Sequence, residues 1–191
     1  LNQNKILDYI VMFFSTVGIA VPSFVIGTVL MYFLSYKWRL LPSATWGSPQ
    51  HVIMPAIALA GLPTAYIARL TRSSMLEVLS QDYMKTAVAK GLPRRRILWV
   101  HAIKNAIIPV VTYLGPLVAG VLTGSFVVEN IFAVPGLGKH FVTSIYNRDY
   151  TVILGVTIFY CVLLILANLI VDLIYPLLDP RIQLSDRKEQ V

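Results

Sequence analysis

The sequence of residues 151–178 is TVILGVTIFYCVLLILANLIVDLIYPLL, in which Asp172 is the one charged residue. A helix needs about 20 predominantly apolar residues to cross a hydrocarbon core about 30 Å thick. This stretch is longer than that, so it predicts a helix that spans a membrane. The whole chain agrees, because 57% of its 191 residues are hydrophobic, 13% are charged and the mean hydropathy is +0.71. These values exclude an ordinary soluble globular domain.

Three further apolar stretches bring the predicted spans to four. They cover about residues 9–35, 51–68 and 106–128, ahead of the span at about 151–178. We therefore predict an all-α fold, a polytopic bundle of membrane helices, with both chain ends on the same side. In the third stretch, Gly120 and Gly124 have the spacing of small-xxx-small helix contacts. We interpret them as ordinary helix-packing positions in preference to a dedicated dimer motif.

The charges of the connecting loops predict the orientation of these spans. Cytoplasmic loops of membrane proteins are enriched in lysine and arginine. The loop between the second and third spans has two acids, Glu77 and Asp82. Its basic residues are far more numerous, namely Arg69, Arg72, Lys85, Lys90, Arg94, Arg95, Arg96 and Lys104. This loop is predicted to be cytoplasmic, and the loops at about 36–49 and 129–150 external. Both chain ends are then cytoplasmic, in a multi-pass protein of the inner (plasma) membrane. The net charge of +7 arises largely in this loop and predicts no nucleic-acid partner.

Few side chains in the sequence suit catalysis or metal binding. Cys161 is the only cysteine and lies in the last apolar stretch, where we interpret it as an inert packed or lipid-facing residue. His51, His101 and His140 lack a metal-ligand spacing and are interpreted as interfacial residues. Asp172 lies inside a span, a position typical of functional acids. At the helical rise of 1.5 Å it is about 7 to 10 Å from the predicted cytoplasmic end, which favours structural pairing over a proton relay.

The basic loop, at about residues 73–105, predicts two helices joined by a sharp turn. From Ser73 to Lys90, apolar residues recur at helical spacing, namely Met75, Val78, Leu79, Tyr83 and Ala87. Gly91 follows where a helix end favours a left-handed residue. Pro93 stands where the next helix favours its first residue.

The surface of this helix-turn-helix combines small and cationic side chains. Ala87 and Ala89 precede the turn, and Arg94, Arg95 and Arg96 follow it. Two interpretations fit such a surface equally well. One is docking into a groove of a cytosolic partner, and the other is attachment to lipid headgroups, which arginines also favour.

Residues 82–91, DYMKTAVAKG, resemble the EAA loop of binding-protein-dependent ABC importers, in the DYxxTAxAKG form of the oligopeptide and dipeptide permeases. The resemblance covers nearly the whole chain. Further matching segments follow the family order: IAVPSF (19–24), ARLTRSSM (68–75), VENIF (128–132), PGLG (135–138), NRDY (147–150) and DPR (179–181). The general EAA pattern ends in I-x-LP, from which HAIK (101–104) departs, as the peptide-permease branch does.

The resemblance implies the type I permease fold, with a transmembrane domain at residues 1–178 and a cytoplasmic tail at 179–191. Family members normally have six spans, so this chain is expected to lack the first helix, the external segment behind it and the second helix. The resemblance implies no catalytic site and no cofactor in this chain, since ATP and Mg²⁺ bind to partner subunits. The sequence agrees, because it has no GxxxxGK[ST] phosphate loop. The residues expected to couple the chain to those ATPases are Asp82, Tyr83, Thr86, Ala87, Ala89, Gly91, Pro93, Arg94 and Arg95.

By this resemblance the chain helps to form the translocation pathway of a peptide importer. The implied partners are a second homologous permease, two cytosolic ATP-binding subunits and an extracellular or periplasmic solute-binding protein. Nickel chelates and glutathione are alternative cargoes of the same family. An intramembrane enzyme would need a nucleophile with a base, a carboxylate pair or a metal cluster, and Asp172 alone supplies none of these. A channel or a purely structural membrane protein leaves the EAA-like loop unexplained.

We predict that a cysteine at Ser74 or Gln81 is labelled only from the cytoplasm, and a cysteine at Ser48 or Thr143 only from outside. The reason is the excess of lysine and arginine in the loop at 73–105. Labelling with an impermeant maleimide, before and after cell lysis, measures the side on which each position lies. Labelling of position 81 in intact cells would reverse the orientation.

Overall fold

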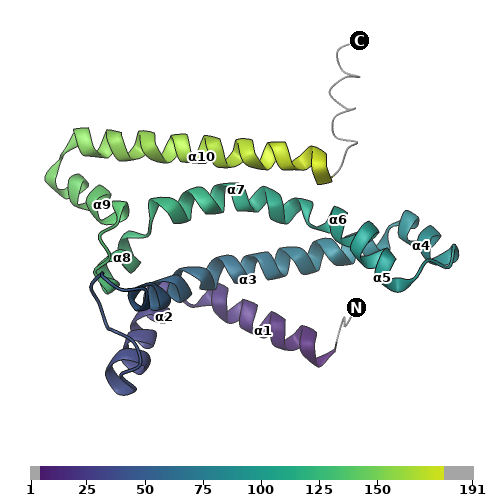
Figure 1. Ribbon diagram of the computed structural model, residues 1–191, viewed down its shortest axis with the longest axis horizontal. Helices are drawn as coiled ribbons and strands as arrows, with labels where there is room; N and C mark the ends of the chain where they lie inside the picture. The colour runs from purple at the N-terminus through teal and green to yellow at the C-terminus, as the bar shows by residue number, and fades with distance from the viewer. Residues whose placement is uncertain (1–4, 179–191) are drawn as a thin grey trace, which may run out of the picture. The chain divides into compact units, whose positions relative to one another are not determined.

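The structure is a computed structural model that describes residues 5–178 (Figure 1). The predicted tail at 179–191, with its DPR segment, lies outside the described residues. Every regular element within residues 5–178 is helical, which confirms the all-α class. The elements are α1 (Ile6–Ala20), α2 (Ser23–Leu30), η1 (Met31–Lys37), α3 (Gln50–Ser80), α4 (Asp82–Ala89), α5 (Arg94–Arg96), η2 (Ile97–Ala102), α6 (Ile103–Ala106), α7 (Ile108–Thr123), α8 (Phe126–Phe132), α9 (Leu137–Asn147) and α10 (Tyr150–Leu178), where η1 and η2 are π-helical.

Two helices are long and apolar enough to cross a membrane as single elements, α3 and α10. They contain the second and fourth spans predicted from the sequence. The other two spans correspond to bent pairs of helices. Ile6–Ala20 and Ser23–Lys37 meet at 101°, and Arg94–Ala106 and Ile108–Thr123 meet at 46°. The described chain therefore has two to four spans by length and composition.

The continuous span predicted at about 9–35 is interrupted at Pro22. Proline has no backbone N–H and disfavours a helical conformation in the residue before it. Val21 is accordingly extended, with φ −93° and ψ 119°. The carbonyl of Pro22 then accepts the N–H groups of Val25 and Ile26 and begins α2. The sequence predicted the apolar length correctly but not the sharp bend.

The third span ends earlier than the predicted residue 128. The helix stops after Thr123, because Gly124 has a φ of +87°, a left-handed conformation that glycine adopts at little cost. Val128 belongs to the separate helix α8. The start of this span is also bent, at Ile107.

The chain divides into two compact units. Among the described residues, the first contains residues 5–68 and 119–163, and the second contains residues 69–118 and 164–178. The long helices α3, α7 and α10 each contribute residues to both units. Each unit is described below by its own contacts.

The core of the first unit joins α2, η1, α3 and α8. Met54 and Ala58 of α3 and Val128 and Phe132 of α8 are buried together. Gly27 of α2 permits this packing, because a Cβ atom there would lie 3.1 Å from Cε2 of Phe132. Ile26, Leu30, Met31, Leu34 and Leu41 pack around the same cluster. Small residues thus allow close helix contact, as the sequence indicated.

His51 closes the loop in front of α3. Its Nδ1 accepts the backbone N–H of Ser48 at 3.2 Å, and its Nε2 lies 3.2 Å from Oγ1 of Thr45. The His51 side chain, in the first turn of α3, thus binds back to the backbone N–H of a residue three positions earlier. The predicted interfacial histidine therefore has a structural role at the start of α3.

In the second unit, α7 and α10 meet at small and polar side chains. A Cβ atom on Gly115 would lie 2.6 Å from Oδ1 of Asn168, so glycine allows the two helices to touch. The hydroxyls of Thr112 and Tyr175 are 2.6 Å apart. Asp172, one helical turn before Tyr175, is exposed instead. The structural pairing predicted for its carboxylate is not made with any residue in the range 5–178.

A buried carboxylate holds the segment between α7 and α10. Glu129 of α8 is 6% exposed and accepts the backbone N–H groups of Gly138 at 3.3 Å and Lys139 at 2.7 Å. These N–H groups belong to the first turn of α9, which the positive end of the helix dipole makes favourable for an anion. A Cβ atom on Gly124, Gly136 or Gly138 would collide with this carboxylate. The glycines of the segment therefore make room for Glu129.

We predict that Glu129→Ala destabilises the α8–α9 segment by about 1–3 kcal/mol, since two partly buried N–H groups lose their acceptor. The mutation should increase the rate of proteolysis between residues 124 and 149 in the full-length protein in detergent. Glu77→Ala is the control, because Glu77 is an exposed acid. Equal proteolysis of the two variants would mean that Glu129 does not hold this segment.

Candidate functional site

The helix predicted from Ser73 to Lys90 is two helices. α3 continues to Ser80, and Gln81 then adopts an extended conformation with φ −67° and ψ 151°. The Gln81 carbonyl accepts the N–H of Met84 at 3.1 Å, which begins α4. Asp82 follows in the first turn, where the helix dipole favours an acid. The chain thus turns at Gln81 as well as at Gly91.

The turn after α4 has the geometry that the sequence predicted. Gly91 is left-handed, with a φ of +70°. Its N–H donates to Val88 O at 2.9 Å, and the N–H of Leu92 donates to Ala87 O at 3.3 Å. These two bonds define a Schellman motif. Pro93 differs slightly from the prediction, because it caps the following helix and Arg94 is the first helical residue.

A small core fixes the two arms of this turn, and we call residues 82–106 the hairpin. Met84 and Ala87 of α4 are buried against Ile97 and Ala102 of η2. The end of α3 contributes Met75, Val78 and Leu79 to the same core, while Leu92 and Leu98 complete it. The hairpin is therefore packed against α3 rather than extended into solvent.

The predicted apolar stripe holds at Ala87, which is buried in the core, and differs from expectation at Tyr83. Tyr83 is 44% exposed, and its hydroxyl accepts a hydrogen bond from Nδ2 of Asn105 at 2.8 Å. Met84 takes its place in the core. Ala87 is 7% exposed, so its side chain does not belong to the surface shoulder inferred from the sequence. Tyr83 lies outside the core because of the break at Gln81, which changes the helical phase between Leu79 and Met84.

The remaining residues predicted to couple the chain to a partner lie on the outer surface of the hairpin. Asp82, Thr86, Ala89, Gly91, Pro93, Arg94 and Arg95 are all exposed. Asp82 pairs with Lys85 at 2.8 Å, but both side chains are largely exposed, and such pairs add little stability. Thr86 donates its hydroxyl to the Asp82 carbonyl at 3.0 Å. This surface therefore presents cations, one acid and a small alanine to a partner.

Sequence reasoning missed the residues that hold the hairpin together. Met84, Ile97 and Ala102 form its core. Trp99 of η2, which sequence reasoning also did not single out, is 72% exposed and lies outside that core. The spacing of Ile97 and Ala102 is not that of a regular α-helix, since η2 is π-helical. Asn105 gave no sequence signal, because its partner Tyr83 lies 22 positions away.

The labelling positions can now be compared with the structure. Gln81, Ser48 and Thr143 are exposed and suit a cysteine probe. Ser74 is buried at the α3 end, so it is a poor position for labelling. Gln81 is the position that tests the orientation.

Known proteins resemble this chain over nearly all of its length. The family described as "binding-protein-dependent transport system inner membrane component" matches residues 1–184. The dipeptide transport system permease protein DppB of Bacillus subtilis is 55% identical over 187 residues, which are 98% of this chain and 61% of that protein. DppB of Lactococcus lactis is 44% identical over 183 residues, or 96% of this chain and 60% of that protein. The oligopeptide transport system permease protein OppB of Haemophilus influenzae is 44% identical over 185 residues, with the same coverage. The chain thus spans about 60% of the length of these relatives.

We predict that Gly91→Val destabilises the hairpin by about 1–2 kcal/mol, the cost of a left-handed conformation for a residue with a Cβ atom. No atom lies within 4 Å of a Cβ at this position, so backbone strain is the expected cause. Gly91→Asn should cost less, because asparagine tolerates this conformation better. Hydrogen–deuterium exchange of residues 82–97 should be faster in the valine variant.

Ala89→Val is the matched control for this experiment, because Ala89 is exposed and helical. Its expected cost is below about 1 kcal/mol. Exchange at the wild-type rate in Gly91→Val would mean that the left-handed turn is not needed for the fold of the hairpin.

Proposed function

The chain belongs to the family of binding-protein-dependent transport system inner membrane components, and we propose that it is the permease part of a peptide importer. In this proposal the spans contribute to the path of the peptide through the membrane. The hairpin receives mechanical input from cytosolic ATPases. The main support for the proposal is the compact hairpin, which packs on the end of α3 and continues along the chain into α7. The chain that carries this hairpin is also similar to proteins named as peptide permeases.

The proposed cargo follows from the names of the relatives. Proteins 44–55% identical to this chain are named as permeases for dipeptides or oligopeptides. Peptide is therefore favoured over the other cargoes considered from the sequence. The proposed partners are a second permease, two ATP-binding subunits and a solute-binding protein, with ATP and Mg²⁺ held by the ATP-binding subunits.

The packing of the hairpin supports a role in transmitting movement. Met84 and Ala87 contact α3 residues and η2 residues in one core. Cores are close-packed and compress little, so a push on α4 moves the end of α3 with it. On the other side, η2 continues through α6 to α7. Force applied to the hairpin therefore reaches two apolar helices through packing and through the chain itself.

The charge of the hairpin supports a docking surface on the cytoplasmic side. Arg94, Arg95 and Arg96 are exposed in consecutive positions beside the turn. Exposed cations steer an acidic partner and set its orientation. Lipid headgroups would attract the same arginines, so the arginines do not distinguish a protein partner from a lipid surface. Ala89, whose small side chain is exposed, is the better position for that distinction. A close protein contact would exclude a larger side chain there, whereas a lipid surface would accept it.

We predict that Ala89→Trp removes coupling while leaving the hairpin folded. The full-length permease carrying this change should insert normally and keep wild-type hydrogen exchange at residues 82–97. It should lose copurification with its ATPases, and peptide-stimulated ATP hydrolysis should fall by at least about tenfold, the effect of a 1.4 kcal/mol loss.

Ala87→Trp is the comparison variant for this experiment. Ala87 is buried, so a tryptophan overpacks the core at a cost of about 1–3 kcal/mol or more. Fast exchange should accompany its loss of coupling, which separates a misfolded hairpin from a blocked surface. Normal stimulated hydrolysis and uptake in Ala89→Trp would exclude this face of the hairpin as the docking site.

A further inference from the structure

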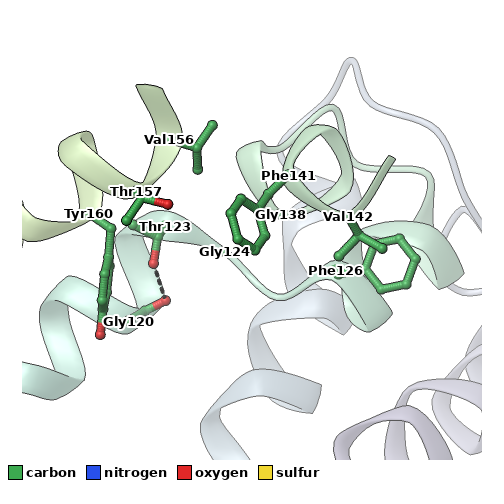
Figure 2. Close-up of a pocket in the computed structure, with 10 residues that line it drawn as sticks. All are labelled: Gly120, Thr123, Gly124, Phe126, Gly138, Phe141, Val142, Val156, Thr157 and Tyr160. Carbon is green, nitrogen blue, oxygen red and sulfur yellow. Dashed lines mark hydrogen bonds between the residues drawn. The ribbon is translucent and has the colours of Figure 1, made fainter. Parts of the chain in front are cut away.

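The first unit contains a pocket of about 540 Å³ that the proposed function has not used. Figure 2 shows residues of α7 and α10 on one side of it and residues of α8 and α9 on the other. The rings of Phe126, Phe141 and Tyr160 form much of its wall, and no lining residue is charged. Its size and apolar lining are those of small-molecule sites, which measure about 300–1,000 Å³.

Gly120 leaves space for this pocket. From the sequence, Gly120 and Gly124 were interpreted as helix-packing positions, and within residues 5–178 Gly120 makes no such contact. A Cβ atom on Gly120 would meet no atom within 4 Å, so no other helix in the described part of the chain packs against this glycine. Gly124 has ended the helix and lies beside Glu129. The missing side chain of Gly120 instead extends the open volume, because Gly120 lines the pocket.

The threonine hydroxyls of the pocket donate to the backbone of their own helices. Thr123 Oγ1 donates to the carbonyls of Ala119 at 3.0 Å and Gly120 at 3.1 Å, and Figure 2 marks the second bond. Thr157 Oγ1 donates to the Ile153 carbonyl at 2.8 Å. Tyr160 differs, because none of the described residues accepts its hydroxyl proton. The pocket therefore combines apolar walls with one available hydrogen-bond donor.

The wall formed by α8 and α9 is fixed before any ligand arrives. Gly138 lines the pocket and donates its N–H to Glu129. Phe126 begins the helix that carries Glu129, so both parts of this wall depend on the same carboxylate. A site that is ordered in advance loses less freedom on binding and binds more tightly.

We propose that this pocket receives an uncharged, apolar side chain of the peptide cargo, with the Tyr160 hydroxyl donating to a neighbouring peptide carbonyl. The inference rests on the proposed function and adds a substrate preference to it. Apolar walls without a counter-charge penalise a lysine or glutamate side chain, since a buried charge requires a partner. A phenylalanine or leucine side chain gains from the same walls. The available donor fits the uncharged carbonyl that every peptide bond carries.

The test fills the pocket in the full-length permease assembled with its partners. Gly120→Leu places a side chain in the pocket, and Gly155→Leu is the matched control. Gly155 lies on α10, also has no atom within 4 Å of its Cβ position, and does not line the pocket. Uptake of radiolabelled Ala-Phe and Ala-Ala is measured in reconstituted vesicles at equal protein level.

The expected result is a change in selectivity. Gly120→Leu should lower the Ala-Phe to Ala-Ala ratio of kcat/KM by at least about tenfold, the usual effect of one or two methylenes in an apolar pocket. Gly155→Leu should keep the wild-type ratio. Tyr160→Phe removes only one hydroxyl. It should raise the KM of both peptides about three- to tenfold, because the loss of one neutral hydrogen bond weakens binding by about that factor.

Two outcomes would overturn the pocket proposal, and a third, distinguishable from them, would contradict the proposed function. An unchanged ratio in Gly120→Leu, with normal uptake, overturns the pocket proposal and leaves the permease function intact. An equal loss for both peptides also overturns it, because a lipid chain or another helix would then fill the pocket. Failure of the wild-type assembly to import any peptide would instead contradict the proposed function itself.

Discussion

The first N–H groups of a helix have no partner inside that helix, so a buried helix start needs an acceptor from elsewhere in the protein. Within residues 5–178, the chain itself supplies such acceptors at three helix starts. The Pro22 carbonyl starts α2, and the Glu129 carboxylate receives the first N–H groups of α9. Asp149 accepts the N–H of Val152 at 3.1 Å and starts α10. Because these helix starts have acceptors, short helices can join the long ones and form the pocket and the hairpin.

The local features of the fold could be predicted from the sequence. Gly91 was predicted to be left-handed because a Schellman turn depends on a few neighbouring residues. The apolar length of α3 and α10 is likewise visible in the residues themselves. The face of α4 was not predictable in the same way. One extended residue, Gln81, changes the helical phase, and so Met84 replaces Tyr83 in the core.

The features that depend on distant backbone groups could not be predicted. Glu129 was noted within the VENIF segment but not as an acceptor, because its acceptor role involves main-chain N–H groups nine and ten residues later. The segment NRDY at 147–150 was known only as a family resemblance. In the structure, Arg148 is left-handed with a φ of 56°, and Asp149 caps the next helix. This segment thus forms the turn between α9 and α10. The need for that turn is a physical reason for the NRDY pattern.

The hairpin is built from contacts between residues close in the chain, since Met75, Ala87 and Ala102 meet in one core. The core of the first unit instead joins Ala58 to Val128, across a much longer stretch of chain. Loop closure costs more entropy as the separation grows, and contacts between near neighbours form sooner. During synthesis the hairpin can therefore adopt its shape before α8 exists, whereas the first unit must wait for residues 119–163. The surface proposed to meet the ATPases is then ready ahead of the pocket.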